Sequence, residues 1–457
     1  MRLPIRGTFF MRHLTLETRG LAKDTAILSI GKGATVLGML AQITLLTHVL
    51  GLTKYGIFAI AVSFVALVDR FFDVDVTKAA LTFGARFMPD EPRRLAGVFQ
   101  LSYAVDGVLG VLGFTVVAIA APFAGPWLVG DQGTLLFLLY GLTLLASTVD
   151  SSSMALLQVL DRYPTLTGLV IFREIMRVAL VATAVLTFHS LVAVMIALVA
   201  LDALVGVGGA WLATRAFRRR FDAHSLLRLH LGEARSVRRA MLGMVFQTNI
   251  IGYGRLAEAQ LPALIVGAVS GPLEAGVFKL GMAGAIAMGQ VSDPAWNAVM
   301  PRLARLWSAG RVSDVRRMLR QATFLAGGAM VALGTIAILL RFPILHAFGG
   351  KEAGAAAMVF TLGVIRTAVN GVFFWNDPLL YAAGRARLVR QIYLPSVGVM
   401  LVLCLVLTRN MGANGAAISV LISGVLANVG LVLAAMAVLA SSDKAEVPPE
   451  TAASVRG

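Results

Sequence analysis

Four cationic side chains interrupt long apolar runs of this sequence, well away from the ends of those runs. An ionisable side chain at bilayer depth costs several kcal/mol unless it faces a water-filled cavity or a partner. If the runs cross a membrane, the four cations are tolerable where they line a shared polar cavity, and such a cavity suits an anionic cargo. Arginine suits an anion with paired oxygens, because its planar fork donates two hydrogen bonds at once. The residues predicted to bind substrate are Lys32, Arg70, Arg255, Arg366 and Asn370, which lies one turn after Arg366.

Local ion pairing is the alternative interpretation of the same cations. Arg70 and Asp73 are three residues apart, as are Arg255 and Glu258, and such neighbours meet on a helix surface. Lys32 lies only about six residues, or roughly 9 Å, into its run, so its chain could reach the interface instead. The sequence leaves both interpretations open.

Three acids are the predicted ion-coupling residues: Asp69, Asp73 and Asp293. Asp69 and Asp73 share a helix face about one turn apart, and two like charges favour protonation of one of them. Asp293 lies 220 residues after Asp73, at the corresponding level of the second half of the chain. We therefore predict coupling to protons or sodium. Arg173 and Arg177 could guide the anionic cargo or contact a lipid phosphate, and their spacing does not separate these roles.

No other cofactor is predicted from the residues. The six histidines include no pair four residues apart, and Cys404 is the single cysteine, so neither a zinc site nor a disulfide is expected. Gly31-Lys32-Gly33 lacks the preceding glycine of a phosphate-binding loop. No catalytic triad or paired-carboxylate arrangement is present either, so we do not expect an enzyme.

Composition places the chain in a membrane. Of its 457 residues 58% are hydrophobic and only 14% charged, with a mean hydropathy of +0.81, whereas soluble domains carry about 25% charged residues. The net charge of +16 would suit nucleic acid in a soluble protein, but no basic module with interleaved aromatic residues supports that partner. We attribute the charge to the positive-inside rule and to contact with anionic lipids.

Twelve apolar runs are long enough to span a bilayer, which needs about 20 residues. They are 26–49, 57–84, 98–121, 134–158, 165–187, 190–213, 242–269, 275–299, 321–341, 355–382, 389–408 and 413–440. With the N-terminus inside, the inner segments hold 28 Lys and Arg and the outer loops hold 4. Both termini are therefore predicted to be cytoplasmic. The first 23 residues lack a discrete apolar core and a cleavage site, so they are not expected to be a signal peptide.

The two halves of the sequence contain a repeat. Residues 51–58 (GLTKYGIF) match residues 271–278 (GPLEAGVF) at an offset of 220, each in the outer turn after the first span of its half. The predicted fold is all-α, with twelve transmembrane helices in two six-helix lobes. Because six is an even number, the lobes are parallel and related by a pseudo-two-fold axis along the membrane normal. The predicted parts are a leader (1–25), the N-lobe (26–213), a cytoplasmic linker (214–240), the C-lobe (241–440) and a cytoplasmic tail (441–457).

The sequence resembles the polysaccharide-type lipid-linked oligosaccharide flippases. The resemblance is carried by the twelve predicted helices in two lobes, by the turn LGLTKYGIFAIA and by its counterpart SGPLEAGVFKLG. These flippases belong to a superfamily with the multidrug and toxic compound extruders and the lipid II flippases. The resemblance covers roughly residues 20–440. It implies movement of an undecaprenyl-diphosphate-linked glycan from the inner to the outer leaflet of a bacterial inner membrane by alternating access. The chain has no room for the two further helices typical of lipid II flippases.

Two alternatives stay open at this point. A drug or cation antiporter of the extruder type would fit the helices, although cations in the cavity argue against a cationic cargo. A membrane glycan polymerase or ligase would act on the outer face and need a long outer loop, whereas every predicted outer loop is short. We expect a monomer, and the residues do not specify which glycan is carried.

Overall fold

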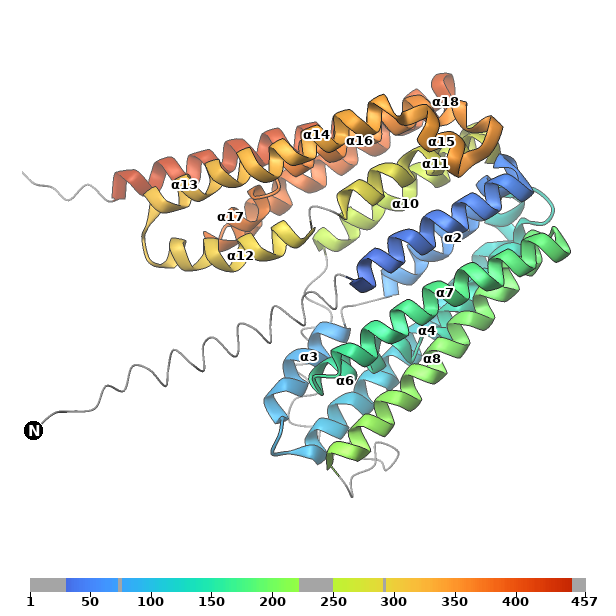
Figure 1. Ribbon diagram of the computed structural model, residues 1–457, viewed down its shortest axis with the longest axis horizontal. Helices are drawn as coiled ribbons and strands as arrows, with labels where there is room; N and C mark the ends of the chain where they lie inside the picture. The colour runs from blue at the N-terminus through green and yellow to red at the C-terminus, as the bar shows by residue number, and fades with distance from the viewer. Residues whose placement is uncertain (1–29, 73–75, 222–249, 291–292, 446–457) are drawn as a thin grey trace, which may run out of the picture. The chain divides into compact units, whose positions relative to one another are not determined.

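The computed structural model describes residues 30–72, 76–221, 250–290 and 293–445 (Figure 1). Within these ranges every regular element is a helix. Helices are expected in the hydrocarbon of a membrane, because a helix satisfies its backbone N–H and C=O groups within one segment. Asp73, the leader 1–25 and residues 222–240 of the predicted linker lie outside the described residues.

The helices of the first half follow one another with short connections. They are Ile30–Leu50, α2 (Leu52–Phe72), α3 (Val76–Phe87), α4 (Pro92–Val129), α5 (Gly133–Ala146), α6 (Asp150–Val159), α7 (Tyr163–Phe188) and α8 (Leu191–Phe221). In the second half they are α10 (Ile250–Ser270), α11 (Pro272–Gly289), α12 (Asp293–Ser308), α13 (Val312–Ala322), the π-helix η1 (Thr323–Gly327), α14 (Gly328–Leu339), α15 (Arg341–Gly349), the 3-10 helix η2 (Gly350–Ala356), α16 (Ala357–Val372), α17 (Asn376–Ala382) and α18 (Ala386–Ala445).

Seven of the described helices are long and apolar enough to cross a membrane. Large apolar side chains are also exposed on the helices, among them Phe123 at 77% and Phe324 at 81%. Apolar surface of this kind is unfavourable in water and is favoured in contact with lipid hydrocarbon. The chain is therefore a multi-pass membrane protein. The count of twelve spans, the two-lobe arrangement and the orientation of the termini stay predictions.

Two of the predicted spans are interrupted. Residues 147–149 separate α5 from α6, and residues 373–375 separate α16 from α17. Polar residues follow directly in each case: Asp150 begins α6, and Asn376 with Asp377 begins α17. Pro378 is compatible with this place because its missing N–H falls in the first helical turn. Broken helices at membrane depth are tolerated where the backbone is buried in protein or lines a polar cavity.

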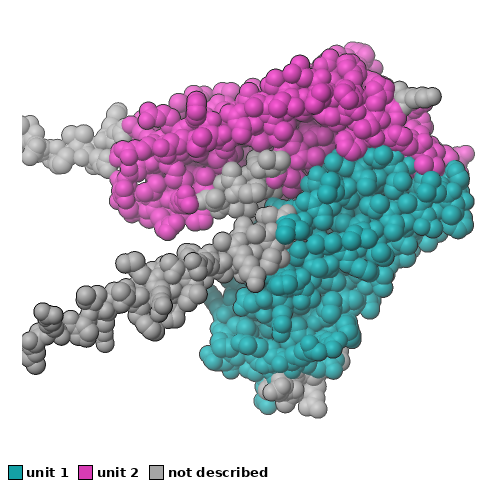
Figure 2. Space-filling model, in the orientation of Figure 1, with its two compact units in different colours: residues 1–45, 68–123, 134–249 teal, residues 46–67, 124–133, 250–457 magenta. Residues whose placement is uncertain are grey.

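The chain divides into two compact units, each with its own core (Figure 2). Unit 1 comprises residues 1–45, 68–123 and 134–249, and Phe99, Leu156 and Phe217 are fully buried in one of its apolar clusters. Unit 2 comprises residues 46–67, 124–133 and 250–457, and Leu303 and Leu379 are fully buried in it. The lobe boundaries expected at 26–213 and 241–440 stay a prediction.

Candidate functional site

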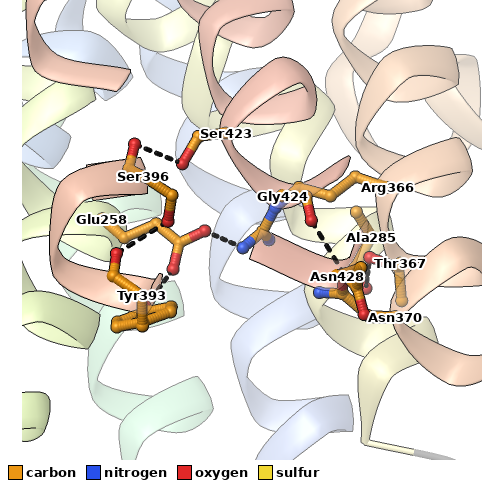
Figure 3. A network of polar contacts seen from close by, with 10 residues as sticks. All are labelled: Glu258, Ala285, Arg366, Thr367, Asn370, Tyr393, Ser396, Ser423, Gly424 and Asn428. Atoms are coloured by element: carbon orange, nitrogen blue, oxygen red, sulfur yellow. Dashed lines mark hydrogen bonds and ion pairs between the residues drawn. The ribbon is translucent and has the colours of Figure 1, made fainter. Parts of the chain in front are cut away.

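A buried ion pair joins α10 to α16 inside unit 2 (Figure 3). The Arg366 guanidinium donates to one carboxylate oxygen of Glu258, and the Tyr393 hydroxyl donates to the other. The Arg366 side chain is 20% exposed and that of Glu258 is 11% exposed. Gly424 on α18 makes room for the guanidinium, because a Cβ there would lie 2.9 Å from Arg366 Nε. Arg366 Nε is buried and has no hydrogen-bond partner among the described residues.

Asn370 continues this polar network by one helical turn, as its spacing from Arg366 predicts. Its side-chain oxygen accepts from Asn428 Nδ2 at 2.6 Å, and the same nitrogen donates to the Gly424 carbonyl at 2.9 Å (Figure 3). The network thus connects α16 to α18 by groups that can also bind oxygen-rich ligands.

Arg255 pairs across helices instead of along its own. Its guanidinium lies 3.0 Å from an Asp377 oxygen, so the expected alternative pair with Glu258 is wrong. The other Asp377 oxygen and both amide atoms of the buried Asn376 have no partner among the described residues. The two charged residues of α10 thus point to different elements, Arg255 to Asp377 on α17 and Glu258 to Arg366 on α16. The Arg255 side chain itself is 59% exposed.

The described site residues predicted in the first half lie in unit 1. Lys32 and Asp69 are exposed, and Arg70 is half-buried in the last turn of α2. Asp69 lines a cavity of about 140 Å³ in unit 1. Polar groups of Asp106, Ser147, Thr148 and Ser151 line it too. Two further coupling acids were predicted. Asp73 lies outside the described residues. Asp293 is the first residue of α12, but its side chain is not among those described.

Arg173 and Arg177 have carboxylate partners in unit 1. Arg173 donates to Asp150 at 2.5 Å, and Arg177 donates to Glu174 at 3.1 Å. Asp150 is the residue that follows the break between α5 and α6, just as Asp377 follows the break between α16 and α17. Each of these two aspartates gives one oxygen to an arginine and has a second, buried oxygen with no partner among the described residues.

The structure therefore joins predicted cations to acids that sequence reasoning did not assign to them. Arg255, Arg366 and Asn370 lie in unit 2 with the unexpected partners Asp377, Glu258 and Tyr393. Two guanidinium groups face two carboxylates, so these pairs are neutral as a set and not cationic. The clue in the sequence was that Glu258 and Asp377 also lie inside apolar runs, where a charge needs a partner. Nothing in the sequence pointed to Tyr393.

Comparison with known proteins identifies the family. The sequence model described as "Polysaccharide biosynthesis protein" matches residues 21–307, which is more than half of the chain. The chain belongs to this family. Its membership confirms the resemblance seen in the turns at residues 50–61 and 270–281.

The individual proteins that this chain resembles are distant from it in sequence. The inner membrane protein YghQ of Escherichia coli is 25% identical over 342 residues, which cover 72% of this chain and 93% of YghQ. An inward-facing multidrug resistance MATE transporter of the MOP superfamily superimposes with a TM-score of 0.73 at 12% identity, covering 93% of this chain and 100% of the transporter. The lipid II flippase MurJ in an inward closed conformation gives 0.64 at 13% identity, covering 91% and 90%. The fold of this chain is that of these membrane transporters.

Proposed function

We propose that the chain is a secondary transporter that flips a glycan, linked through a diphosphate to undecaprenyl, from the inner to the outer leaflet of a bacterial inner membrane. Family membership and the transporter fold support transport over catalysis. Alternating access fits a fold built from repeats with polar groups between spanning helices. Cytoplasmic termini and an inner-membrane location belong to the same proposal.

The Arg366 guanidinium is the observation that carries this proposal. It lies within a helix apolar enough to span the membrane, Glu352–Ala382, and is mostly buried there. Its Nε has no partner among the described residues, so the fork has a donor to spare. A planar guanidinium with a free donor suits phosphate oxygens, which can accept two hydrogen bonds from it at once.

Partner exchange explains how paired arginines can bind an anion. An incoming diphosphate competes with Glu258 for Arg366 and with Asp377 for Arg255. A proton taken up by either carboxylate removes that competitor, and its release restores the ion pair after the cargo leaves. The arginines then remain paired throughout the cycle, so no bare cation is left at bilayer depth.

A drug or cation antiporter is the second candidate, and one observation favours it. The pairs Arg255–Asp377 and Arg366–Glu258 are neutral as a set, so they do not exclude a cationic cargo by charge. The MATE fold is also matched at least as well as that of MurJ. The cargo itself discriminates between the two functions.

Purified protein in proteoliposomes is expected to move a fluorescent undecaprenyl-diphosphate oligosaccharide between leaflets and to leave a cationic dye in place. Leaflet exchange is followed by the fraction of fluorescence that an external quencher removes, with protein-free vesicles as the control. Movement of the dye without movement of the glycan lipid would establish the antiporter instead.

Ion coupling through Asp69, Asp73 and Asp293 is part of the proposal, and Asp69 is the member whose side chain the structure describes. Asp69→Asn is expected to remove the response of glycan flux to an imposed proton or sodium gradient, because the amide neither titrates nor carries charge. Flux without a gradient should persist. The matched control is Asp131→Asn, on an exposed acid outside the spans. A wild-type gradient response in Asp69→Asn would exclude this residue from coupling.

A further inference from the structure

The two repeated turns have the same backbone geometry. Gly51 and Gly271 both have positive φ, 82° and 88°, which favours glycine. Each precedes the helix that begins at the next residue, α2 at Leu52 and α11 at Pro272. A second glycine follows five residues later in each repeat, Gly56 in α2 and Gly276 in α11.

These second glycines meet each other. A Cβ added to Gly276 would lie 2.5 Å from the Leu52 carbonyl oxygen and 3.2 Å from the Gly56 Cα. A Cβ added to Gly56 would collide with the Pro272 carbonyl in turn. The contact is reciprocal, as expected of two equivalent surfaces related by a two-fold axis. Close backbone approach at small residues is the usual way in which membrane helices pack without long side chains between them.

Further contacts near these glycines join residues 46–67, from the first half of the sequence, to helices of the second half. All of them lie within unit 2. Thr47 Oγ1 donates to the Phe348 carbonyl at 2.6 Å. Ile60, one turn after Gly56, is fully buried and packs on Gly267 of α10. These contacts explain why residues 46–67 belong to unit 2 although they precede it by about 200 residues in sequence.

We propose that the crossing of α2 and α11 at Gly56 and Gly276 is the outer closure of the transport path. This inference rests on the proposed function, because it assumes alternating access, and on the predicted outer position of both turns. For cargo to leave outward, α2 and α11 must separate at this crossing. Backbone faces backbone at these two glycines, so the two helices can separate there and return to the same contact. A larger side chain at either position prevents the close approach and holds the crossing open.

Accessibility of a cysteine below the crossing tests the closure. In a Cys404→Ala background, Ile60→Cys serves as a reporter for a membrane-impermeant maleimide added from outside. Adding Gly56→Leu or Gly276→Leu is expected to raise the labelling rate at least several-fold. The matched control is Gly398→Leu, a helical glycine with open space around its Cβ position, which should leave labelling unchanged. Unchanged labelling in both variants, with monodisperse protein, overturns the proposal.

A smaller substitution provides a second test that does not depend on folding of the leucine variants. In the Cys404→Ala/Ile60→Cys background, Gly276→Ala would place a methyl group 2.5 Å from the Leu52 carbonyl oxygen. It should therefore raise the labelling rate, whereas Gly398→Ala should not. Labelling of the Gly276→Ala variant at the rate of its parent overturns the closure. Labelling needs no cargo, so increased labelling in a protein that moves no glycan lipid would refute the proposed function and leave the closure intact.

Discussion

Arg255→Ala is expected to abolish export of the lipid-linked glycan while the protein remains folded in the membrane. The Arg255 side chain is 59% exposed, so its removal affects packing little. Loss of a charge-assisted hydrogen bond to the diphosphate corresponds to about 3 kcal/mol, or a roughly 100-fold lower transport rate if it acts in the rate-limiting step. Complementation of a strain that lacks the transporter, with surface glycan as the readout, measures this effect.

Three variants separate the role of Arg255 in binding from its role as a partner of Asp377. Arg255→Lys should retain part of the activity, because the charge survives although the fork does not. The double variant Arg255→Ala/Asp377→Asn removes the unpaired acid and should still fail to export. Arg341→Ala, at a half-buried arginine that donates to the Ile338 carbonyl of its own chain segment, is the control. Normal export by each of the variants Arg70→Ala, Arg255→Ala and Arg366→Ala would show that these arginines do not bind the cargo.

Glu258→Ala is expected to lower the free energy of unfolding by about 3–5 kcal/mol, because it leaves the buried Arg366 without its carboxylate. It also removes the acceptor of the Tyr393 hydroxyl. The double variant Glu258→Ala/Arg366→Met should regain most of the loss, since an apolar pair of similar volume needs no charge compensation. Equilibrium unfolding in detergent micelles measures both values.

An exposed ion pair gives the matched control for this comparison. Glu91 and Arg94 are three residues apart, lie 2.6 Å apart and are each nearly half exposed. Glu91→Ala should change stability by about 1 kcal/mol or less. If Glu258→Ala is as stable as the wild type, or if the double variant is no more stable than Glu258→Ala, the pair with Arg366 is not a structural element of unit 2.

The sequence by itself determined the class of the protein and where its chemistry is concentrated. Apolar runs interrupted by Arg366 and Arg255 predicted a helical membrane protein with polar groups inside its spans. The repeat at offset 220 located two equivalent turns, and the positive φ of Gly51 and Gly271 agrees with it. These features are local or nearly so, because hydropathy, charge and glycine geometry act on a residue and its immediate neighbours.

Only the tertiary structure decided which groups are partners. Arg255 and Glu258 lie three residues apart on one helix, so the sequence allowed them to pair with each other. In the structure Arg255 pairs with Asp377, and Glu258 pairs with Arg366. Tyr393 reaches Glu258 from 135 residues away. A buried charge takes the partner that the packing of helices places nearest in a medium of low dielectric constant, and that placement depends on the whole fold. For the same reason the two arginines of unit 2 that looked like unpaired cations in the sequence, Arg255 and Arg366, form neutral ion pairs in the folded protein.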